Sequence, residues 1–331
     1  MDKRRLLVSS SPHIRDVETT RHIIWSVIAA LLPASVMSIY FFGPRAGVII
    51  LVSAVTAVAC EYGYQKALGK KVTVDDGSAL LTGLLIGLTM PPSVPFYVPA
   101  IAAFVAIVMA KQLFGGLGFN IFNPALIGRA FVQISFPRLM TSWLEPSAAF
   151  VYVDAVTTAT PLGILKEEGL EKLLGFYGNY LNMYTDLLFG NRAGSLGETS
   201  VFALLIGAAF LLYRRYITWH IPGSFLGTAG LLAWVFGGRE GLFSGDPFLH
   251  LLSGGIILGA FFMATDYVTS PSVRRGQIIF GIGCGFLTVL IRLKGGYPEG
   301  VMFAILLMNC FSPLIDRSFK SSVFGAAGGK D

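Results

Sequence analysis

Charged residues are scarce in this sequence. Lys, Arg, Asp and Glu make up 13% of its 331 residues, whereas apolar residues make up 54% and the mean hydropathy is +0.67. Soluble domains carry about 25% charged residues, so the composition excludes an ordinary soluble domain and indicates an integral membrane protein. We therefore interpret the net charge of +6 as a signal of membrane topology. Membrane lipid is the expected partner, and nucleic acid is not.

Metal-binding patterns are also missing. The chain has three cysteines and four histidines, without a CxxC pair or metal-ligand spacing, so we predict no metal site. Iron–sulfur ligation would need thiolates that this chain does not supply alone. Cys60, Cys284 and Cys310 lie in apolar stretches and are predicted to be inert buried thiols.

A soluble-nucleotide site has little support. The sequence lacks a GxxxxGK[ST] phosphate loop. Gly281, Gly283 and Gly285 lie within an apolar span without a preceding strand, which favours close helix packing over dinucleotide binding.

The sequence does contain about ten apolar segments. They cover approximately residues 23–42, 47–68, 76–89, 98–114, 125–136, 201–213, 221–236, 248–264, 278–291 and 301–315. Several are shorter than the roughly 20 residues that a helix needs to cross a bilayer. The third stops at Met90-Pro91-Pro92 and is predicted to be a broken or re-entrant helix, which is tolerated where it is buried in protein or lines a polar cavity.

The two halves of the chain resemble each other weakly. Two sequence signals recur in both halves, with an apolar span between them. They are Leu88-Thr89-Met90-Pro91-Pro92-Ser93 and Asn123-Pro124 in the first half, and Thr265-Asp266 and Ser312-Pro313 in the second. Five segments per half would make the second half an inverted copy, whose broken helices meet near the bilayer midplane. Alternatively, these prolines only mark helix ends. The predicted division is a segment 1–22, a five-helix repeat 23–136, a loop 137–198, a second repeat 199–316 and a tail 317–331.

The distribution of basic residues predicts the orientation. Lys and Arg are concentrated in the terminal segments and in alternate connections, including Arg214-Arg215 and Arg274-Arg275. By the positive-inside rule, both termini are cytoplasmic and the 137–198 loop is extracytoplasmic. The N-terminal sequence lacks the pattern of a cleavable signal peptide, so the first apolar segment is expected to remain as an anchor.

Some charged residues near the membrane have two readings. Asp76 and Asp266 lie beside the broken-helix signals and either line a cavity or cap helices at the interface. Arg129 and Arg317 follow Asn-Pro and Ser-Pro pairs, and either bind an anionic group or anchor helix ends.

The central polar stretch, residues 151–163, is the leading candidate for a functional site. It concentrates Asp154, Thr157, Thr158 and Thr160 in a few residues. Pro161 and Gly163 are predicted to stop regular structure and to keep the segment accessible. On chemistry alone, a threonine-rich turn is also typical of helix caps.

A family resemblance favours the functional reading. The stretch Asp154-Ala155-Val156-Thr157-Thr158-Ala159-Thr160-Pro161-Leu162 resembles the flavin-attachment motif of the RnfD and NqrB subunits of ion-translocating oxidoreductases. Further stretches agree with that family, and the resemblance covers nearly the whole chain: Ser9-Ser10-Ser11-Pro12-His13-Ile14-Arg15, Asp76-Gly77-Ser78-Ala79-Leu80-Leu81-Thr82-Gly83, Phe122-Asn123-Pro124-Ala125 and Ala264-Thr265-Asp266.

The resemblance implies a covalent cofactor. In that family FMN is joined through its phosphate to the last threonine of an [ST]-x-A-T pattern, which here is Thr160, and a flavin transferase makes the bond. Thr157 and Thr158 occupy the first two positions of the pattern, where Ser-Gly is commoner. With Asp154 they are expected to orient the phosphate or the transferase substrate. The family also implies a second, noncovalent flavin, riboflavin, for which no residue here identifies a site.

We therefore predict an all-α polytopic protein of the bacterial or archaeal inner membrane, with about ten transmembrane helices in two inverted five-helix repeats that resemble the urea-transporter-like fold. Its implied function is electron transfer in an Rnf complex, which couples ferredoxin:NAD oxidoreduction to sodium or proton movement. This chain is expected not to catalyse that reaction alone. The implied partners are the other flavinylated and iron–sulfur Rnf subunits. The alternatives are a channel or secondary transporter of the same architecture, or a structural scaffold.

Overall fold

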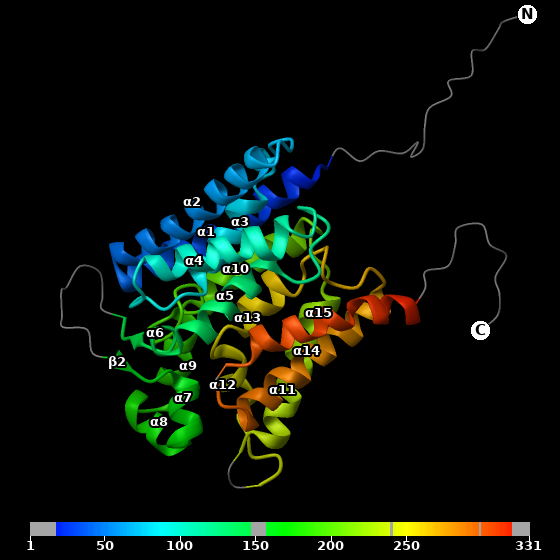
Figure 1. Ribbon diagram of the computed structural model, residues 1–331. Helices are drawn as coiled ribbons and strands as arrows, with labels where there is room; N and C mark the ends of the chain where they lie inside the picture. The colour runs from blue at the N-terminus through cyan, green and yellow to red at the C-terminus, as the bar shows by residue number, and fades with distance from the viewer. Residues whose placement is uncertain (1–17, 147–156, 239–240, 298, 320–331) are drawn as a thin grey trace, which may run out of the picture.

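The computed structural model describes residues 18–146, 157–238, 241–297 and 299–319. Regular structure in these ranges is almost entirely helical, as predicted (Figure 1). The first half contains α1 (Thr20–Phe42), α2 (Pro44–Ala67), the 3-10 turn η1 (Val74–Asp76), α3 (Ser78–Leu88), α4 (Tyr97–Phe104), its π-helical continuation η2 (Val105–Gln112) and α5 (Pro124–Ser135). The second half contains α10 (Val201–Tyr213), α11 (His220–Phe236), α12 (Pro247–Leu252), α13 (Ile256–Leu258), the π-helical η3 (Gly259–Met263), α14 (Arg274–Lys294) and α15 (Val301–Ser318).

Each predicted apolar segment coincides with helical residues. Four helices, namely α1, α2, α14 and α15, are long and apolar enough to cross a membrane. The eighth segment differs from the uninterrupted span 248–264 that we predicted. It breaks at Ser253-Gly254-Gly255, where Gly254 has a φ of +68°, a backbone conformation that residues with a Cβ rarely adopt.

Small residues bring the helices into close contact. Gly281 and Gly285 of α14 face α11, where an added Cβ would lie 2.7 Å from the Ile221 and Phe225 carbonyl oxygens respectively. The helix-packing interpretation of these glycines is therefore confirmed. Gly83 brings α3 equally close to α2, because a Cβ there would lie 2.6 Å from the Ala54 Cα.

The central connection forms a small helical layer at one end of the molecule (Figure 1). It contains α6 (Pro137–Met140), the strands β1 (Trp143–Leu144) and β2 (Thr157–Thr158), α7 (Pro161–Glu167), α8 (Leu170–Tyr177) and α9 (Tyr180–Phe189). The helices α8 and α9 are separated at Gly178-Asn179. Leu173, Met183 and Leu187 pack with Leu249 of α12 and attach this layer to the second half.

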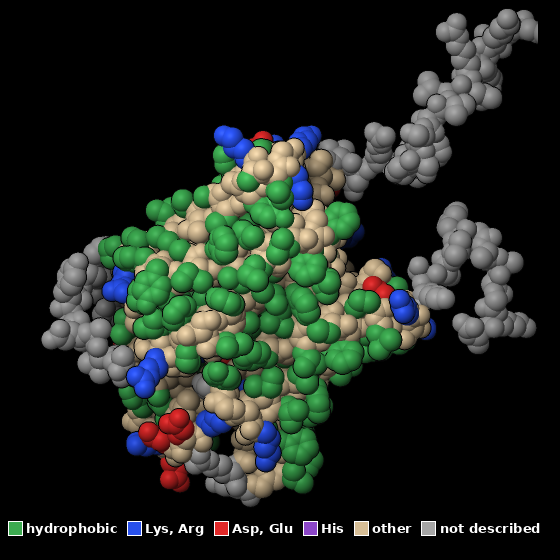
Figure 2. All heavy atoms as spheres, in the orientation of Figure 1, with side chains coloured by type: hydrophobic (Ala, Val, Ile, Leu, Met, Phe, Trp, Pro, Cys, Tyr) green, Lys and Arg blue, Asp and Glu red, His purple; other side chains and the backbone are tan. Residues whose placement is uncertain are grey.

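Apolar side chains cover a broad band of the surface over α1 to α4, as Figure 2 shows. Exposed large residues such as Leu51 and Val55 of α2, and Leu314 of α15, extend well beyond the patches that soluble monomers expose. This surface fits an all-α membrane protein. Cys284 is buried, but Cys310 is exposed on α15, so the prediction of three buried thiols is wrong for that residue.

Candidate functional site

The threonines of the motif lie where the central layer meets the membrane part. Thr157 and Thr158 form β2, which pairs antiparallel with β1 in the register Trp143 to Thr158. The Thr158 Oγ1 is buried and has no hydrogen-bond partner among the described residues. Asp154 lies outside the described residues.

Thr160 ends this strand region and begins α7. Its Oγ1 accepts a hydrogen bond of 3.2 Å from the Gly163 N–H, so Thr160 is the N-cap residue of the helix. Pro161 occupies the first helical position, where its fixed φ favours helix and its missing N–H costs nothing. The prediction that Pro161 and Gly163 stop regular structure is therefore wrong.

Thr160 is also less accessible than expected. Only 9% of its surface is exposed, and Leu162 beside it is buried. Thr160 lines a small cavity of about 10 Å³, together with Arg192, Glu198, Gly254 and Glu299. The motif threonine thus lies beside charged side chains from two separate loops, the one before α10 and the one before α15.

Arg192 fixes the far wall of this cavity. It is buried, its Nη1 donates to the Leu252 carbonyl oxygen at 2.5 Å, and its Nη2 donates to the Glu198 carbonyl oxygen. Burial lowers the pKa of the Arg192 guanidinium, and the Glu198 carboxylate opposes that effect. Arg192 therefore joins the loop after α9 to the break in the second half, and places positive charge beside Thr160.

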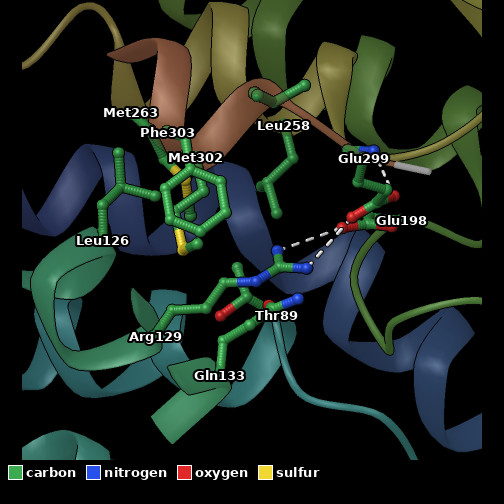
Figure 3. Close-up of a pocket in the computed structure, with 12 residues that line it drawn as sticks. Thr89, Leu126, Arg129, Gln133, Glu198, Leu258, Met263, Glu299, Met302 and Phe303 are labelled. Atoms are coloured by element: carbon green, nitrogen blue, oxygen red, sulfur yellow. Dashed lines mark hydrogen bonds and ion pairs between the residues drawn. The ribbon is translucent and has the colours of Figure 1, made fainter. Parts of the chain in front are cut away.

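Two glutamates converge on Arg129 of α5 (Figure 3). The Arg129 Nη1 lies 3.3 Å from the Glu198 Oε1, and its Nη2 lies 3.0 Å from the Glu299 Oε2. The Gly255 N–H donates to the Glu299 Oε1 at 3.1 Å. Among the described residues, the anionic groups that Arg129 contacts are two carboxyl groups of this chain, and Arg129 is buried beside them.

Arg292 of α14 completes the basic surroundings. Its Nη1 donates to the His250 carbonyl oxygen at 2.5 Å and its Nη2 to the Ser253 carbonyl oxygen at 3.1 Å. A Cβ at Gly254 would lie 3.0 Å from the Arg292 Nη2 and 2.8 Å from the Glu299 Oε1. The glycine at the break thus allows Arg292 and Glu299 to approach each other.

Sequence reasoning found only part of this site. It identified Thr160, Thr158 and Arg129, but it did not connect Arg192, Arg292 or Glu198 with them. Glu299 lies between two apolar segments, a costly position for a charge unless it is paired. The sequence signal that could have indicated the cluster is an acidic residue shortly before an apolar segment, as in the loops that precede α10 and α15.

The pKa of Glu198 predicts how stability depends on pH. Burial and the neighbouring Glu299 carboxylate raise that pKa from 4.5 to about 8. Between pH 4.5 and about pH 8 the folded protein binds more protons than the unfolded chain. The stabilisation of the folded state by protonated Glu198 is therefore complete below pH 4.5 and is lost as the pH rises through about 8. We expect the Tm in detergent to fall between about pH 5 and about pH 9 in the wild type, and to fall less in Glu198→Gln.

Glu167→Gln, which changes an exposed glutamate of α7, is the matched control and should follow the wild-type curve. If the curves of Glu198→Gln and wild type have the same slope, Glu198 does not titrate in this range.

The comparison with known proteins decides the family. The model of the NQR2, RnfD, RnfE family matches residues 7–325. The chain belongs to this family. The predicted resemblance is therefore confirmed over almost the whole chain.

Several members of the family are similar over their full lengths. The chain is 51% identical to the D subunit of the proton-translocating ferredoxin:NAD(+) oxidoreductase complex of Clostridium ljungdahlii, over 98% of this chain and 97% of that protein. It is 44% identical to the D subunit of the Na(+)-translocating ferredoxin:NAD(+) oxidoreductase complex of Acetobacterium woodii, over 98% and 97%. It is 38% identical to the D subunit of the ion-translocating oxidoreductase complex of Pectobacterium atrosepticum, over 96% and 98%.

Proposed function

We propose that this chain is the RnfD component of an Rnf-type complex and carries electrons through FMN joined covalently to Thr160. The observation that carries the proposal is the pattern Thr157-Thr158-Ala159-Thr160, whose last hydroxyl lies beside the buried Arg192. The full-length similarity to the corresponding components of ferredoxin:NAD(+) oxidoreductase complexes supports it. The complex, rather than this chain alone, is the oxidoreductase.

The residues around Thr160 suit an anionic phosphodiester. Arg192 supplies a buried guanidinium on the same cavity, and guanidinium groups are preferred partners of phosphate oxygens. Thr158, with its unpartnered Oγ1, is a further donor close to the attachment point. Asp154 and Thr157 stay in the proposal as residues that orient the phosphate or are recognised by the flavin transferase.

A larger cavity offers room for the flavin ring. It has a volume of about 980 Å³ and shares Leu162 with the cavity at Thr160. Apolar side chains line one part, including Leu165 of α7 and Phe286 of α14, while His250 and Arg292 line another. This mixture of apolar walls and a few polar groups is typical of cofactor sites. Bound there, FMN would supply one- and two-electron redox chemistry, and the chain's own residues would hold and orient it.

The membrane arrangement is part of the proposal. We propose about ten membrane segments in two inverted five-helix halves, both termini in the cytoplasm and Thr160 on the extracytoplasmic side of the inner membrane. The third and eighth segments, which have the same rank in the two halves, are both irregular: α3 ends at Leu88 before Pro91-Pro92, and the eighth segment breaks at Ser253-Gly254-Gly255. Electron transfer would be coupled to proton or sodium movement, the ions that relatives' names state. Flavinylated and iron–sulfur subunits would be the partners, and riboflavin a second flavin.

Fluorescence of the denatured protein tests the attachment. After coexpression with a flavin transferase, we expect an ultraviolet-fluorescent gel band for the wild type and complete loss of fluorescence in Thr160→Ala, because only the Thr160 hydroxyl forms the ester. Thr157→Ser and Thr158→Ser, which keep a hydroxyl at each position, are the matched controls and should stay fluorescent. An antibody against a terminal tag confirms equal amounts in the membrane.

A dark wild-type band, with the transferase active on a control substrate, would refute covalent flavin and favour the transporter alternative. Fluorescence that persists in Thr160→Ala but disappears in Thr157→Ala or Thr158→Ala would move the attachment to that neighbour.

A further inference from the structure

The two carboxyl groups on Arg129 belong to different parts of the chain. Glu198 lies in the loop before α10, and Glu299 lies in the loop before α15. Figure 3 shows the two carboxyls side by side, with Arg129 reaching both from α5. The ionisation of the two groups is linked, because the Glu299 carboxylate raises the pKa of Glu198 while Glu198 helps to lower the pKa of Glu299.

This pair separates two small cavities. Glu198 and Glu299 line the cavity at Thr160, and they also line an inner cavity of about 20 Å³ with Arg129, Leu126 and Met263. A cavity needs about 10–15 Å³ to hold one water molecule, so each side of the pair has space of that order. The Arg129 Nε is buried in this region and has no partner among the described residues, so it is a donor available to such a water.

The charges that face the pair determine what it can bind. Three guanidinium groups surround it: Arg129 of α5, Arg192 of the loop after α9 and Arg292 of α14. His250 of α12 lies behind Arg292, which binds its carbonyl oxygen. Arg129 contacts one oxygen of each carboxyl group and the Gly255 N–H contacts the other oxygen of Glu299, so cationic or N–H groups already face these oxygens. Among the described residues, no group of three or more His, Cys, Asp or Glu could hold a metal ion. The chemistry therefore favours a proton over a metal cation.

We propose that Glu198 and Glu299 form a proton-binding site whose occupancy depends on the redox state of the flavin on Thr160. The link to the flavin rests on the proposed function, whereas proton binding itself rests on the two glutamates. Glu198 is the titrating member, because burial and the adjacent Glu299 carboxylate raise its pKa to about 8. Glu299 is held ionised, because Arg129 and the hydrogen bond from Glu198 outweigh its own burial and lower its pKa.

The coupling is electrostatic and balanced in charge. An electron on a flavin at Thr160 would add one negative charge beside the shared cavity and would favour the protonated form of Glu198. Where Glu198 is ionised, above about pH 8, it would then take one proton from water on the Thr160 side, which restores the local charge, and would release that proton when the electron leaves. Interactions between nearby buried charges are strong because solvent screens them little.

Infrared spectroscopy tests proton binding without the flavin. The purified Thr160→Ala protein, which lacks the attachment site, is titrated with acid and base while the C=O stretch of protonated carboxyl groups is recorded. We expect a band that titrates near neutral to mildly alkaline pH, and that is absent in Thr160→Ala/Glu198→Gln. The amide of glutamine keeps the shape and the hydrogen bond of a protonated Glu198, so the fold should be preserved. Thr160→Ala/Glu167→Gln is the control and should keep the band.

Redox titration tests the link. In the wild-type complex, the midpoint potential of the covalent flavin should fall with rising pH above the Glu198 pKa of about 8, by up to about 59 mV for each tenfold fall in proton concentration when one proton accompanies one electron. In Glu198→Gln this contribution should be lost, and in Glu167→Gln it should be retained.

Each negative result refutes a defined part. If no titrating carboxyl band depends on Glu198, the pair does not bind a proton. A band that shifts with sodium at constant pH would overturn the proton assignment in favour of a metal cation. If the band is present but wild type and Glu198→Gln have the same potential slope, the pair is not linked to the flavin. A dark wild-type gel band would refute the proposed function and the link with it, whereas the infrared result would still decide whether the pair binds a proton.

Discussion

Lys111→Met is expected to lower the free energy of unfolding by about 3–5 kcal/mol, the usual effect of removing one partner from a buried ion pair. Lys111 and Glu61 are 2% and 1% exposed, and the Lys111 Nζ lies 2.7 Å from the Glu61 Oε2. The same Nζ donates to the Ser78 Oγ at 2.6 Å, so it joins η2, α2 and α3. Unfolding by SDS in mixed detergent micelles would measure the loss.

A double variant separates the loss of charge balance from the loss of packing. Methionine keeps much of the lysine stem, and Glu61→Gln removes the charge that Lys111→Met leaves unpaired. The amide keeps the neighbours Gln112 and Gln65, whose Nε2 atoms lie 2.8 and 3.2 Å from the Glu61 Oε1. We expect Glu61→Gln/Lys111→Met to recover most of the lost stability. Equal losses in the single and double variants would show that the ion pair is not the cause.

Gly207→Ala is the second substitution with a large expected effect. Gly207 lies where α10 crosses α1, and an added Cβ would be 2.0 Å from the Ala30 carbonyl oxygen and 3.2 Å from the Phe262 Cζ. Backbone cannot move aside as a flexible side chain can, so the two helices would have to separate. Overpacking in a close-packed interior costs about 1–3 kcal/mol or more, which the same SDS titration can measure.

The matched control is Gly227→Ala in α11. It adds the same methyl group to a helical glycine that has no heavy atom within 4 Å of the new Cβ. Alanine favours helix over glycine, so this variant should be as stable as the wild type or slightly more stable. If the two alanine variants have equal stability, the contact between α10 and α1 is looser than the structure indicates.

The arrangement of apolar segments was predictable because it depends on local composition. Stretches such as 23–42 and 301–315 differ from their flanks in hydropathy, and α1 and α15 follow at almost those positions. The break in the eighth segment also had a local signal, Ser253-Gly254-Gly255, which the apolar average over 248–264 concealed. Helix ends inside apolar runs depend on individual residues, so hydropathy averaged over a window of residues does not reveal them.

The candidate site was predictable only where a motif marks it. Thr160 belongs to a contiguous pattern, so the sequence was enough to single it out. Arg192, Glu198 and Glu299 come from loops that are distant from α5 in the chain, and their convergence on Arg129 and Thr160 depends on helix packing. The burial of Thr160 has the same origin, because Arg192, Gly254 and Glu299 cover it from other parts of the chain.

The buried position of Thr160 determines an order of events during biogenesis. A transferase needs the hydroxyl exposed, whereas the finished fold covers it and uses its oxygen to cap α7. If Thr160 carries the flavin, attachment must come before the central layer closes over the second half, or must wait for that layer to open. A chain that folds completely before the flavin is attached could then no longer be modified while it stays folded. The supply of flavin during membrane insertion, and not only the amount of protein made, would set how many working copies a cell contains.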